Sequence, residues 1–281
     1  MIATDTKPTG YMKKPSEPDS GFVSNEVQAF VLAGVRASGD ALATTHNVPS
    51  KAHIKIAGQS MIARVLSALS QSDTIKAITI IGLEGGDALS QAEDWPAVFH
   101  QRGAPGPAAS VYGALDEAGR GYPILVTTCD HALLTPEMID TFLRLSLQSS
   151  ADLTVALARR ADIEDTYPDV RRTYLKFGDA HYSSCNLFCL LTPAAREVVS
   201  FWRTAEEDRK RPWRIAWRFG LVRALRLLIG RPALPGVFKI VSGRLGVEIK
   251  PVVLPFADAA VDVDTPDDLA LVERIISERG G

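Results

Sequence analysis

The sequence has few cysteines and no long apolar run. Its three cysteines, Cys129, Cys185 and Cys189, form neither a Cys-x-x-Cys pair nor a Cys/His cluster. A disulfide framework and a zinc site are therefore not indicated, and a reducing cytoplasm is the expected compartment. No uninterrupted apolar run reaches the ~18 residues of a membrane-spanning helix, and the N-terminus lacks the apolar core of a signal peptide, so we expect neither segment.

An excess of charge of either sign is also missing. The chain has 31 Lys and Arg against 33 Asp and Glu in 281 residues, a formal net charge of -2. This balance predicts no bulk attraction to nucleic acid or to anionic membranes. The sequence contains neither a G-x-S-x-G elbow nor a credible nucleophilic triad, so a serine-nucleophile mechanism is not expected.

Strand-like and helix-like patterns alternate along most of the chain. Residues 1–24 are rich in Pro, Ser, Thr, Asp and Lys, which predicts a mobile tail, and 25–281 is expected to be a single domain. The pattern predicts an α/β fold, namely a three-layer α/β/α sandwich with a mostly parallel, mixed, Rossmann-like sheet. The expected strands are 27–33, 75–81, 96–101, 122–128, 151–158 and 247–254, with 174–177 and 183–191 as a further pair that could be antiparallel.

The first apolar strand is followed by a glycine-containing loop, residues 34–40. Backbone N–H groups at such a turn can face an anion, although an ordinary strand-to-loop turn would have the same composition. Gly34 and Gly39 have the outer spacing of a P-loop, but Asp40 stands where that motif needs lysine. The dinucleotide-binding pattern also fails, because Val35 and Arg36 follow Gly34.

Acidic residues lie where two predicted elements meet the carboxyl edge of the sheet. Asp130 follows the strand at 122–128, and Asp264 precedes the last helix. Open α/β sheets bind ligands at this edge, and two carboxylates there can hold Mg²⁺, with Asp262 as an alternative to Asp264. Arg36 and Lys51 would supply positive charge for a triphosphate. Each aspartate could instead cap a turn or a helix.

Five segments, in this order, resemble the motifs of MobA-like nucleotidyltransferases. They are Leu32-Ala-Gly34 with a basic residue after it, Lys51-Ala-His-Ile-Lys-Ile-Ala-Gly-Gln-Ser-Met61, Gly106-Pro-Ala-Ala-Ser110, Thr127-Thr-Cys-Asp-His-Ala-Leu-Leu-Thr-Pro136 and Val261-Asp-Val-Asp-Thr-Pro-Asp-Asp-Leu269. The resemblance extends from about 28 to 275, nearly the whole predicted domain. It implies the fold of the nucleotide-diphospho-sugar transferases, also called the GT-A type.

The resemblance also implies a role for individual residues. The phosphates would lie on backbone amides around Ala33, Gly34 and Val35, and the base would lie against Gly106, Pro107 and Ser110. Arg36 and Lys51 would stabilise charge on the α-phosphate and on pyrophosphate, Asp130 and Asp264 would bind Mg²⁺, and Asn186 would contact the second substrate. The chain departs from the family pattern at Val35, which replaces a glycine.

The implied reaction is Mg²⁺-dependent transfer of an NMP group from an NTP to a phosphorylated acceptor, with release of pyrophosphate. An acceptor phosphate is already ionised at neutral pH, because its second pKa is about 6, so it needs no general base. A glycosyltransferase of the same fold is an alternative, but Cys129-Asp130-His131 lacks the D-x-D sequence that it would need. A nucleotide-binding scaffold without turnover is another alternative, and its support is Val35.

An arginine-rich, largely helical insertion is expected at about 196–231. If 212–229 is helical, its apolar residues occupy every sector of the helix, unlike those of an interfacial helix. One interpretation is a packed helix whose arginines extend to water. The other is a cap over the acceptor pocket, in which Arg214 and Arg218 bind an anionic acceptor such as a lipid-headgroup precursor, with peripheral membrane contact.

Overall fold

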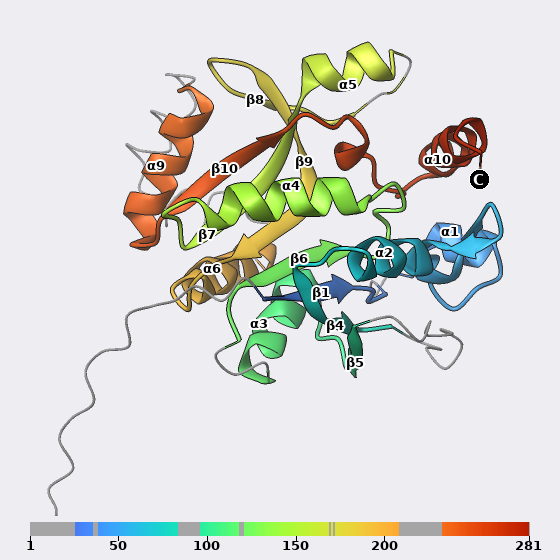
Figure 1. Ribbon diagram of the computed structural model, residues 1–281, viewed down its shortest axis with the longest axis horizontal. Coiled ribbons are helices and arrows are strands. Elements are labelled where there is room, and N and C mark those ends of the chain that lie inside the picture. The colour runs from blue at the N-terminus through green and yellow to red at the C-terminus, as the bar shows by residue number, and fades with distance from the viewer. Residues whose placement is uncertain are drawn as a thin grey trace, which may run out of the picture.

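The computed structural model describes residues 26–35, 39–83, 96–117, 121–168, 170, 172–207 and 232–280 (Figure 1). The predicted tail at 1–24 and the predicted site residues Arg36, Arg214 and Arg218 lie outside these ranges. The described residues of the arginine-rich stretch lie in helix α6 (Ala195–Glu207), and the rest of the predicted insertion at about 196–231 lies largely outside the described ranges.

One mixed sheet forms the centre of the molecule. Its strands run in the order β10-β7-β9-β6-β1-β4-β5, and β8 pairs with β9. Neighbouring strands are parallel except where β9 runs antiparallel to β6, β7 and β8, so the predicted mostly parallel, mixed sheet is confirmed. The strands are β1 (Val27–Leu32), β4 (Ile75–Ile81), β5 (Ala97–Gln101), β6 (Ile124–Thr128), β7 (Leu153–Arg159), β8 (Leu175–Lys176), β9 (His181–Leu190) and β10 (Ile249–Leu254).

Helices cover both faces of this sheet, which explains why its central strands are continuous apolar runs. Helices α2 (Met61–Ser70) and α4 (Pro136–Leu147) pack against one face. Helices α3 (Pro107–Glu117), α6 and α9 (Leu234–Leu245) pack against the other. The three-layer arrangement expected from the sequence is therefore present (Figure 1).

Side-chain caps begin the helices that approach the carboxyl edge of the sheet. The Ser60 hydroxyl accepts from Ala63 N at 3.4 Å at the start of α2, and the Thr135 hydroxyl accepts from Met138 N at 3.3 Å at the start of α4. Helix α10 (Pro266–Glu278) begins with a capping box, in which Thr265 and Asp268 exchange side-chain-to-backbone bonds. The segments just before these helices are thereby held in place.

Several short elements were not predicted, because they are too brief to show a hydrophobic period. They are α1 (Ala41–Thr45), η1 (Lys51–His53), β2 (Lys55–Ile56), β3 (Gln59–Ser60), α5 (Arg160–Thr166) and η3 (Asp258–Ala260). Asp40 caps α1 by accepting from Leu42 N at 2.9 Å. Among the described helices, none combines the length and the apolar character needed to cross a bilayer.

Candidate active site

Three segments meet at the carboxyl ends of β1 and β6. Asp130 lies directly after β6, where Cys129 N donates to the carbonyl of Leu32 at 2.9 Å and so ties this segment to the end of β1. Val263 N donates to the carbonyl of Asp130 at 3.1 Å, which fixes the segment that leads into α10 beside it. The two predicted metal-binding segments are therefore joined by a backbone hydrogen bond.

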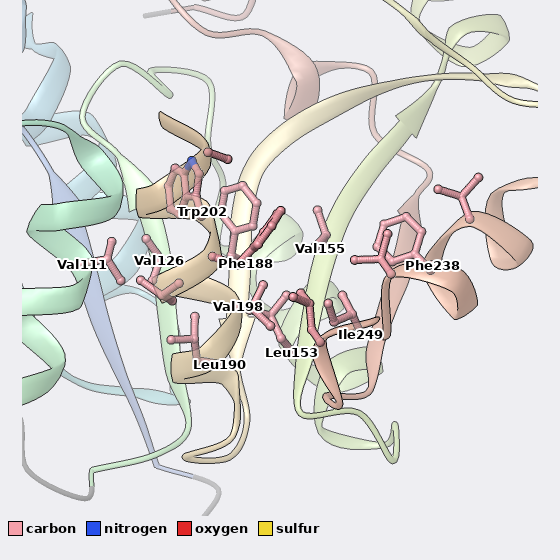
Figure 2. A pocket seen from close by; sticks show the side chains of 16 residues that line it. Val111, Val126, Leu153, Val155, Phe188, Leu190, Val198, Trp202, Phe238 and Ile249 are labelled. Atoms are coloured by element: carbon pink, nitrogen blue, oxygen red, sulfur yellow. The ribbon is translucent and has the colours of Figure 1, made fainter. Parts of the chain in front are cut away.

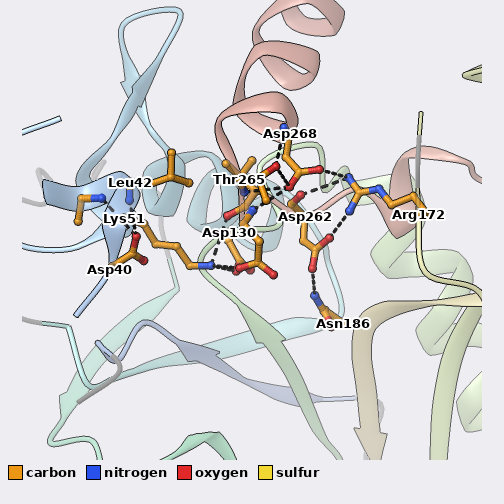
Figure 3. A network of polar contacts seen from close by, with 12 residues as sticks. Asp40, Leu42, Lys51, Asp130, Arg172, Asn186, Asp262, Thr265 and Asp268 are labelled. Atoms are coloured by element: carbon orange, nitrogen blue, oxygen red, sulfur yellow. Dashed lines mark hydrogen bonds and ion pairs between the residues drawn. The ribbon is translucent and has the colours of Figure 1, made fainter. Parts of the chain in front are cut away.

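Lys51 is bonded to both predicted metal ligands (Figure 3). Its ammonium donates to Asp130 Oδ2 in a short contact, to Asp264 Oδ1 at 2.7 Å, and to the carbonyl of Val263 at 3.3 Å. The Lys51 and Asp130 side chains are 18% and 10% exposed, whereas that of Asp264 is 47% exposed. One cationic group thus bridges a buried and an open carboxylate.

The charge of Lys51 is stabilised by this arrangement. Burial by itself disfavours the ammonium, but the negative charges and hydrogen bonds of Asp130 and Asp264 outweigh it and raise the pKa of Lys51 above its ordinary value. The side chain is therefore fully protonated at neutral pH. It can act as a fixed positive charge and not as a proton acceptor.

Asp262 belongs to a different network on the far side of the same segment. Arg172 donates to Asp262 Oδ1 at 2.5 Å and contacts Asp268 Oδ1 at 3.2 Å. Asn186 Nδ2 donates to Asp262 Oδ2 at 3.1 Å, from a backbone with φ of 49° (Figure 3). Because Arg172 and Asn186 hold Asp262, whereas the same Lys51 ammonium contacts Asp130 and Asp264, Asp264 is the better candidate to share a metal with Asp130.

The pKa of Asp262 reflects this competition of charges. Burial raises it above the ordinary range, and the neighbouring Asp130 and Asp264 carboxylates raise it further, while Arg172 lowers it. Asp130, Asp262 and Asp264 are thus close enough to disfavour one another's negative charge, and a cation beside them relieves this repulsion.

One observation supports the interpretation that these residues could bind Mg²⁺. Asp130 Oδ1 is buried and has no hydrogen-bond partner among the described residues, so a buried carboxylate oxygen remains available as a ligand. Within the described ranges no cluster of three or more His, Cys, Asp or Glu side chains could hold a metal. Two carboxylates fit Mg²⁺ only with further oxygens from substrate phosphates or water, which is the usual way in which this ion is bound.

Three glycines line the edge of the sheet beside this cluster. A Cβ on Gly82 would lie 2.9 Å from Gly34 Cα and 3.3 Å from Gly103 Cα, so the three backbones are in direct contact. A Cβ on Gly34 itself would meet no atom of the described residues within 4 Å, so the described part of the chain leaves its outer side open to a ligand. The amide of Ala33 is already used, because it donates to the carbonyl of Ile81 at 2.9 Å. Backbone contacts to a phosphate would therefore begin at Gly34 and Val35.

The predicted base-proximal loop is held by its own side chains and by α6. Ser110 Oγ accepts from Ala104 N at 2.9 Å and donates to the carbonyl of Ala104 at 3.1 Å. Gly106 has φ of 97°, and Pro107 is the first residue of α3. Glu206 accepts from Ala108 N at 3.2 Å, and its carboxylate would lie 2.8 Å from a Cβ on Gly106. The loop therefore requires glycine at 106.

Sequence reasoning missed Arg172 and Glu206. Arg172 lies 90 residues from Asp262, and Glu206 lies 98 residues from Ala108. No local motif marks either residue, and Glu206 is one acid within the arginine-rich stretch. Only the tertiary fold shows what each side chain contacts.

An apolar cavity of about 430 Å³ lies elsewhere, between α6, α9 and the sheet (Figure 2). Its walls include Val126, Phe188, Trp202, Phe238 and Ile249, and none of the described residues that line it is charged. These walls are unsuited to a triphosphate, and the carboxyl-edge cluster remains the candidate site.

Comparison with known proteins agrees with this architecture. Residues 29–212 match the model of the MobA-like NTP transferase domain. A search of curated proteins found no match. Among solved structures, a hypothetical transferase from Thermus thermophilus is 28% identical with a TM-score of 0.73, covering 87% of this chain and 99% of that one.

Two more distant structures share the fold. The 4-diphosphocytidyl-2C-methyl-D-erythritol synthase from Anaerococcus prevotii is 10% identical with a TM-score of 0.58, covering 91% of this chain and 98% of that one. A CMP:2-keto-3-deoxy-manno-octonic acid synthetase complexed with CTP is 11% identical with a TM-score of 0.54, covering 90% of this chain and 98% of that one. The expected nucleotide-diphospho-sugar transferase fold is confirmed.

Proposed function

Because this chain belongs to the MobA-like NTP transferase family, and is thus a nucleotidyltransferase, we propose that it transfers an NMP group from an NTP to a phosphorylated acceptor and releases pyrophosphate. The observation that carries the proposal is the cluster of Lys51, Asp130 and Asp264 beside the open backbone of Gly34. It combines a permanently charged ammonium, carboxylates suited to Mg²⁺ and a place for phosphates at one edge of the sheet.

The proposed chemistry needs alignment and charge stabilisation more than proton transfer. An acceptor phosphate monoester with a second pKa of about 6 is ionised at neutral pH and can attack the α-phosphorus directly. His131, which follows Asp130 in the sequence, is buried, and burial lowers its pKa to about 4, so it is neutral at pH 7. A neutral, buried imidazole is consistent with a reaction that relies on alignment and charge stabilisation.

Positive charge is the main contribution that the site would make. Lys51 would stabilise charge that develops on the α-phosphate and on the leaving pyrophosphate, with Arg36 as a second cation. Asp130 and Asp264 would hold Mg²⁺, which supplies charge neutralisation and orientation of the phosphate oxygens when bound. Gly34 and Val35 would contact the phosphates, and the loop from Gly106 to Ser110 would lie beside the base.

For the acceptor we propose contacts from Asn186, Arg214 and Arg218. Support from the structure exists for Asn186, whose amide lies beside Asp262 and close to the metal segment. We further propose a cytoplasmic enzyme, because Cys129, Cys185 and Cys189 are buried free thiols, as expected in a reducing compartment.

The decisive test is the Asp130→Ala variant. We expect pyrophosphate release to fall by at least about a hundredfold, because a buried metal ligand is lost. The assay would combine each of the four common NTPs, including CTP, with Mg²⁺ and a mixture of sugar and polyol phosphates. Asp165→Ala, an exposed aspartate on α5, is the matched control and should retain full activity.

Retained activity in Asp130→Ala, with an unchanged melting temperature, would remove the central proposal. Turnover of nucleotide sugars without pyrophosphate release would instead indicate a glycosyltransferase. Nucleotide binding without any turnover would indicate the scaffold alternative, in which Val35 obstructs the loop.

A further inference from the structure

The ammonium of Lys51 occupies the space between the two carboxylates that we propose as metal ligands. It contacts Asp130 Oδ2, and its distances to Asp264 Oδ1 and the Val263 carbonyl are 2.7 and 3.3 Å. All three partners are oxygen atoms, and oxygen is also the ligand type that Mg²⁺ takes. An ammonium and a divalent cation therefore compete for the same oxygen atoms.

Simultaneous occupation is unfavourable for electrostatic reasons. Two cations that share one pair of carboxylates would repel each other at close range in a partly buried site, where screening by water is weak. Removing the ammonium without replacing it is equally unfavourable, since it leaves Asp130 buried and without a cation. The pair of carboxylates is therefore stable with one cation or the other.

We infer that Lys51 is an internal competitor for the metal, so that Mg²⁺ binds tightly only when nucleotide phosphates draw the ammonium away. This inference rests on the proposed nucleotidyltransferase function. It assigns Lys51 two positions: on the carboxylates before the nucleotide binds, and on the phosphates afterwards. Metal binding and nucleotide binding are then thermodynamically coupled, and each must increase the affinity of the other by the same factor.

The surroundings of Lys51 favour such an exchange. Lys51 is the first residue of the short helix η1, and its flexible four-carbon stem can reorient without movement of the backbone. Asp264 is 47% exposed, so the contact between Lys51 and Asp264 opens toward water. Asp130 Oδ1 has no hydrogen-bond partner in the part of the chain that the structure describes, which offers a metal its first ligand before the ammonium has left.

The test measures binding of Mn²⁺ alone by electron paramagnetic resonance, without nucleotide. We expect Lys51→Met to bind Mn²⁺ at least about tenfold more tightly than the wild-type protein, since the competing cation is absent. Lys55→Met, which removes an exposed lysine four positions away, is the matched control and should bind like the wild type. It accounts for the general effect of one lost positive charge.

A second variant and a second measurement keep the inference testable if Lys51→Met folds poorly. Lys51→Gln should show the same direction of change, and in either variant Mg²⁺ alone should raise the melting temperature more than it does in the wild type. Equal or weaker Mn²⁺ binding by folded Lys51 variants would overturn the inference.

Failure of the proposed function gives a different result. If neither the wild type nor any variant binds Mn²⁺ even with a non-hydrolysable NTP analogue, the proposed metal site is wrong. The proposed competition by Lys51 is then wrong as well. If the wild type binds Mn²⁺ tightly without nucleotide, the metal site stands and only the competition by Lys51 is wrong.

Discussion

At the level of single residues, two cations divide three aspartates into separate groups. Lys51 contacts Asp130 and Asp264, and Arg172 pairs with Asp262. Arg172 also contacts Asp268, the capping residue of α10, and so connects the pair to the start of that helix. The contacts of Arg172 make Asp262 a structural anchor, which leaves Asp264 to face the proposed metal position.

The two aspartates should therefore respond differently to the same substitution. We expect Asp264→Asn to reduce Mg²⁺-dependent turnover by at least about a hundredfold with little loss of stability, because its side chain is half exposed. Asp262→Asn should retain most activity and change the free energy of unfolding by no more than about 1 kcal/mol, because relief of a buried charge offsets the lost ion pair with Arg172. Steady-state kinetics and urea unfolding provide the two measurements.

Asp267→Asn is the matched control for both variants. Asp267 is exposed in the first turn of α10, three residues after Asp264. Both its turnover and its unfolding free energy should equal those of the wild type. If Asp262→Asn were the variant that lost Mg²⁺-dependent turnover, Asp262 and not Asp264 would be the second metal ligand.

At the level of elements, the ends of three parallel strands determine the shape of the proposed phosphate site. β1 ends before Gly34, β4 ends before Gly82, and β5 is followed by Gly103. Their backbones meet within van der Waals contact, because none of them has a Cβ. This close approach keeps the loop after β1 against the sheet, and the outer side of Gly34 stays open.

Gly82→Ala should disturb this arrangement. Its backbone has φ of 81°, which alanine adopts only with strain, and the new Cβ would lie 2.9 Å from Gly34 Cα. We expect the free energy of unfolding to fall by about 1–3 kcal/mol and the KM for the NTP to rise, since Gly34 must move. Urea unfolding and kinetics with varied NTP would measure the two effects.

Gly113→Ala is the control for this substitution. Gly113 lies within α3, and a Cβ there would meet nothing within 4 Å. Alanine should leave KM unchanged and stabilise the helix by about 0.5–1 kcal/mol. A KM for Gly82→Ala equal to that of the wild type would show that the nucleotide does not depend on the position of Gly34.

At the level of the whole molecule, the candidate site is assembled from distant parts of the chain. Lys51 is 79 residues from Asp130 and 213 residues from Asp264, and the three meet only when the sheet and α10 are in place. A ligand that binds this site therefore binds the folded state alone. Binding of such a ligand should therefore raise the free energy of unfolding of the whole protein.

We accordingly expect a preferred NTP with Mg²⁺ to raise the melting temperature by more than the sum of the separate effects of NTP and Mg²⁺. At a ligand concentration about 100 times its Kd, the stabilisation is about 2.7 kcal/mol, which corresponds to several degrees for a chain of this size. Thermal unfolding with each NTP, with and without Mg²⁺, provides the measurement. Strictly additive shifts would contradict the coupling of metal and nucleotide.

The sequence by itself determined the fold class, and it predicted which residues lie at the carboxyl edge of the sheet. Buried parallel strands must be continuous apolar runs, so they can be predicted from a short stretch of sequence. Helix N-caps can be predicted in the same way, because they use characteristic residues such as Ser60, Thr135 and Thr265. Residues that directly follow strands, such as Gly34 and Asp130, could be placed at one edge because parallel strands bring their carboxyl ends together. Short elements such as α1 and η1 were not predicted, because they are too short to show a hydrophobic periodicity.

Only the tertiary structure decided how the charges are paired. Asp262 and Asp264 are equivalent in the sequence, but alternate residues of an extended segment need not face the same partner, and the choice depends on Arg172. The position of Glu206 against Gly106 likewise follows from the packing of α6 on α3. Such contacts join side chains that are far apart along the chain, so their partners are set by the packing of elements and not by local pattern.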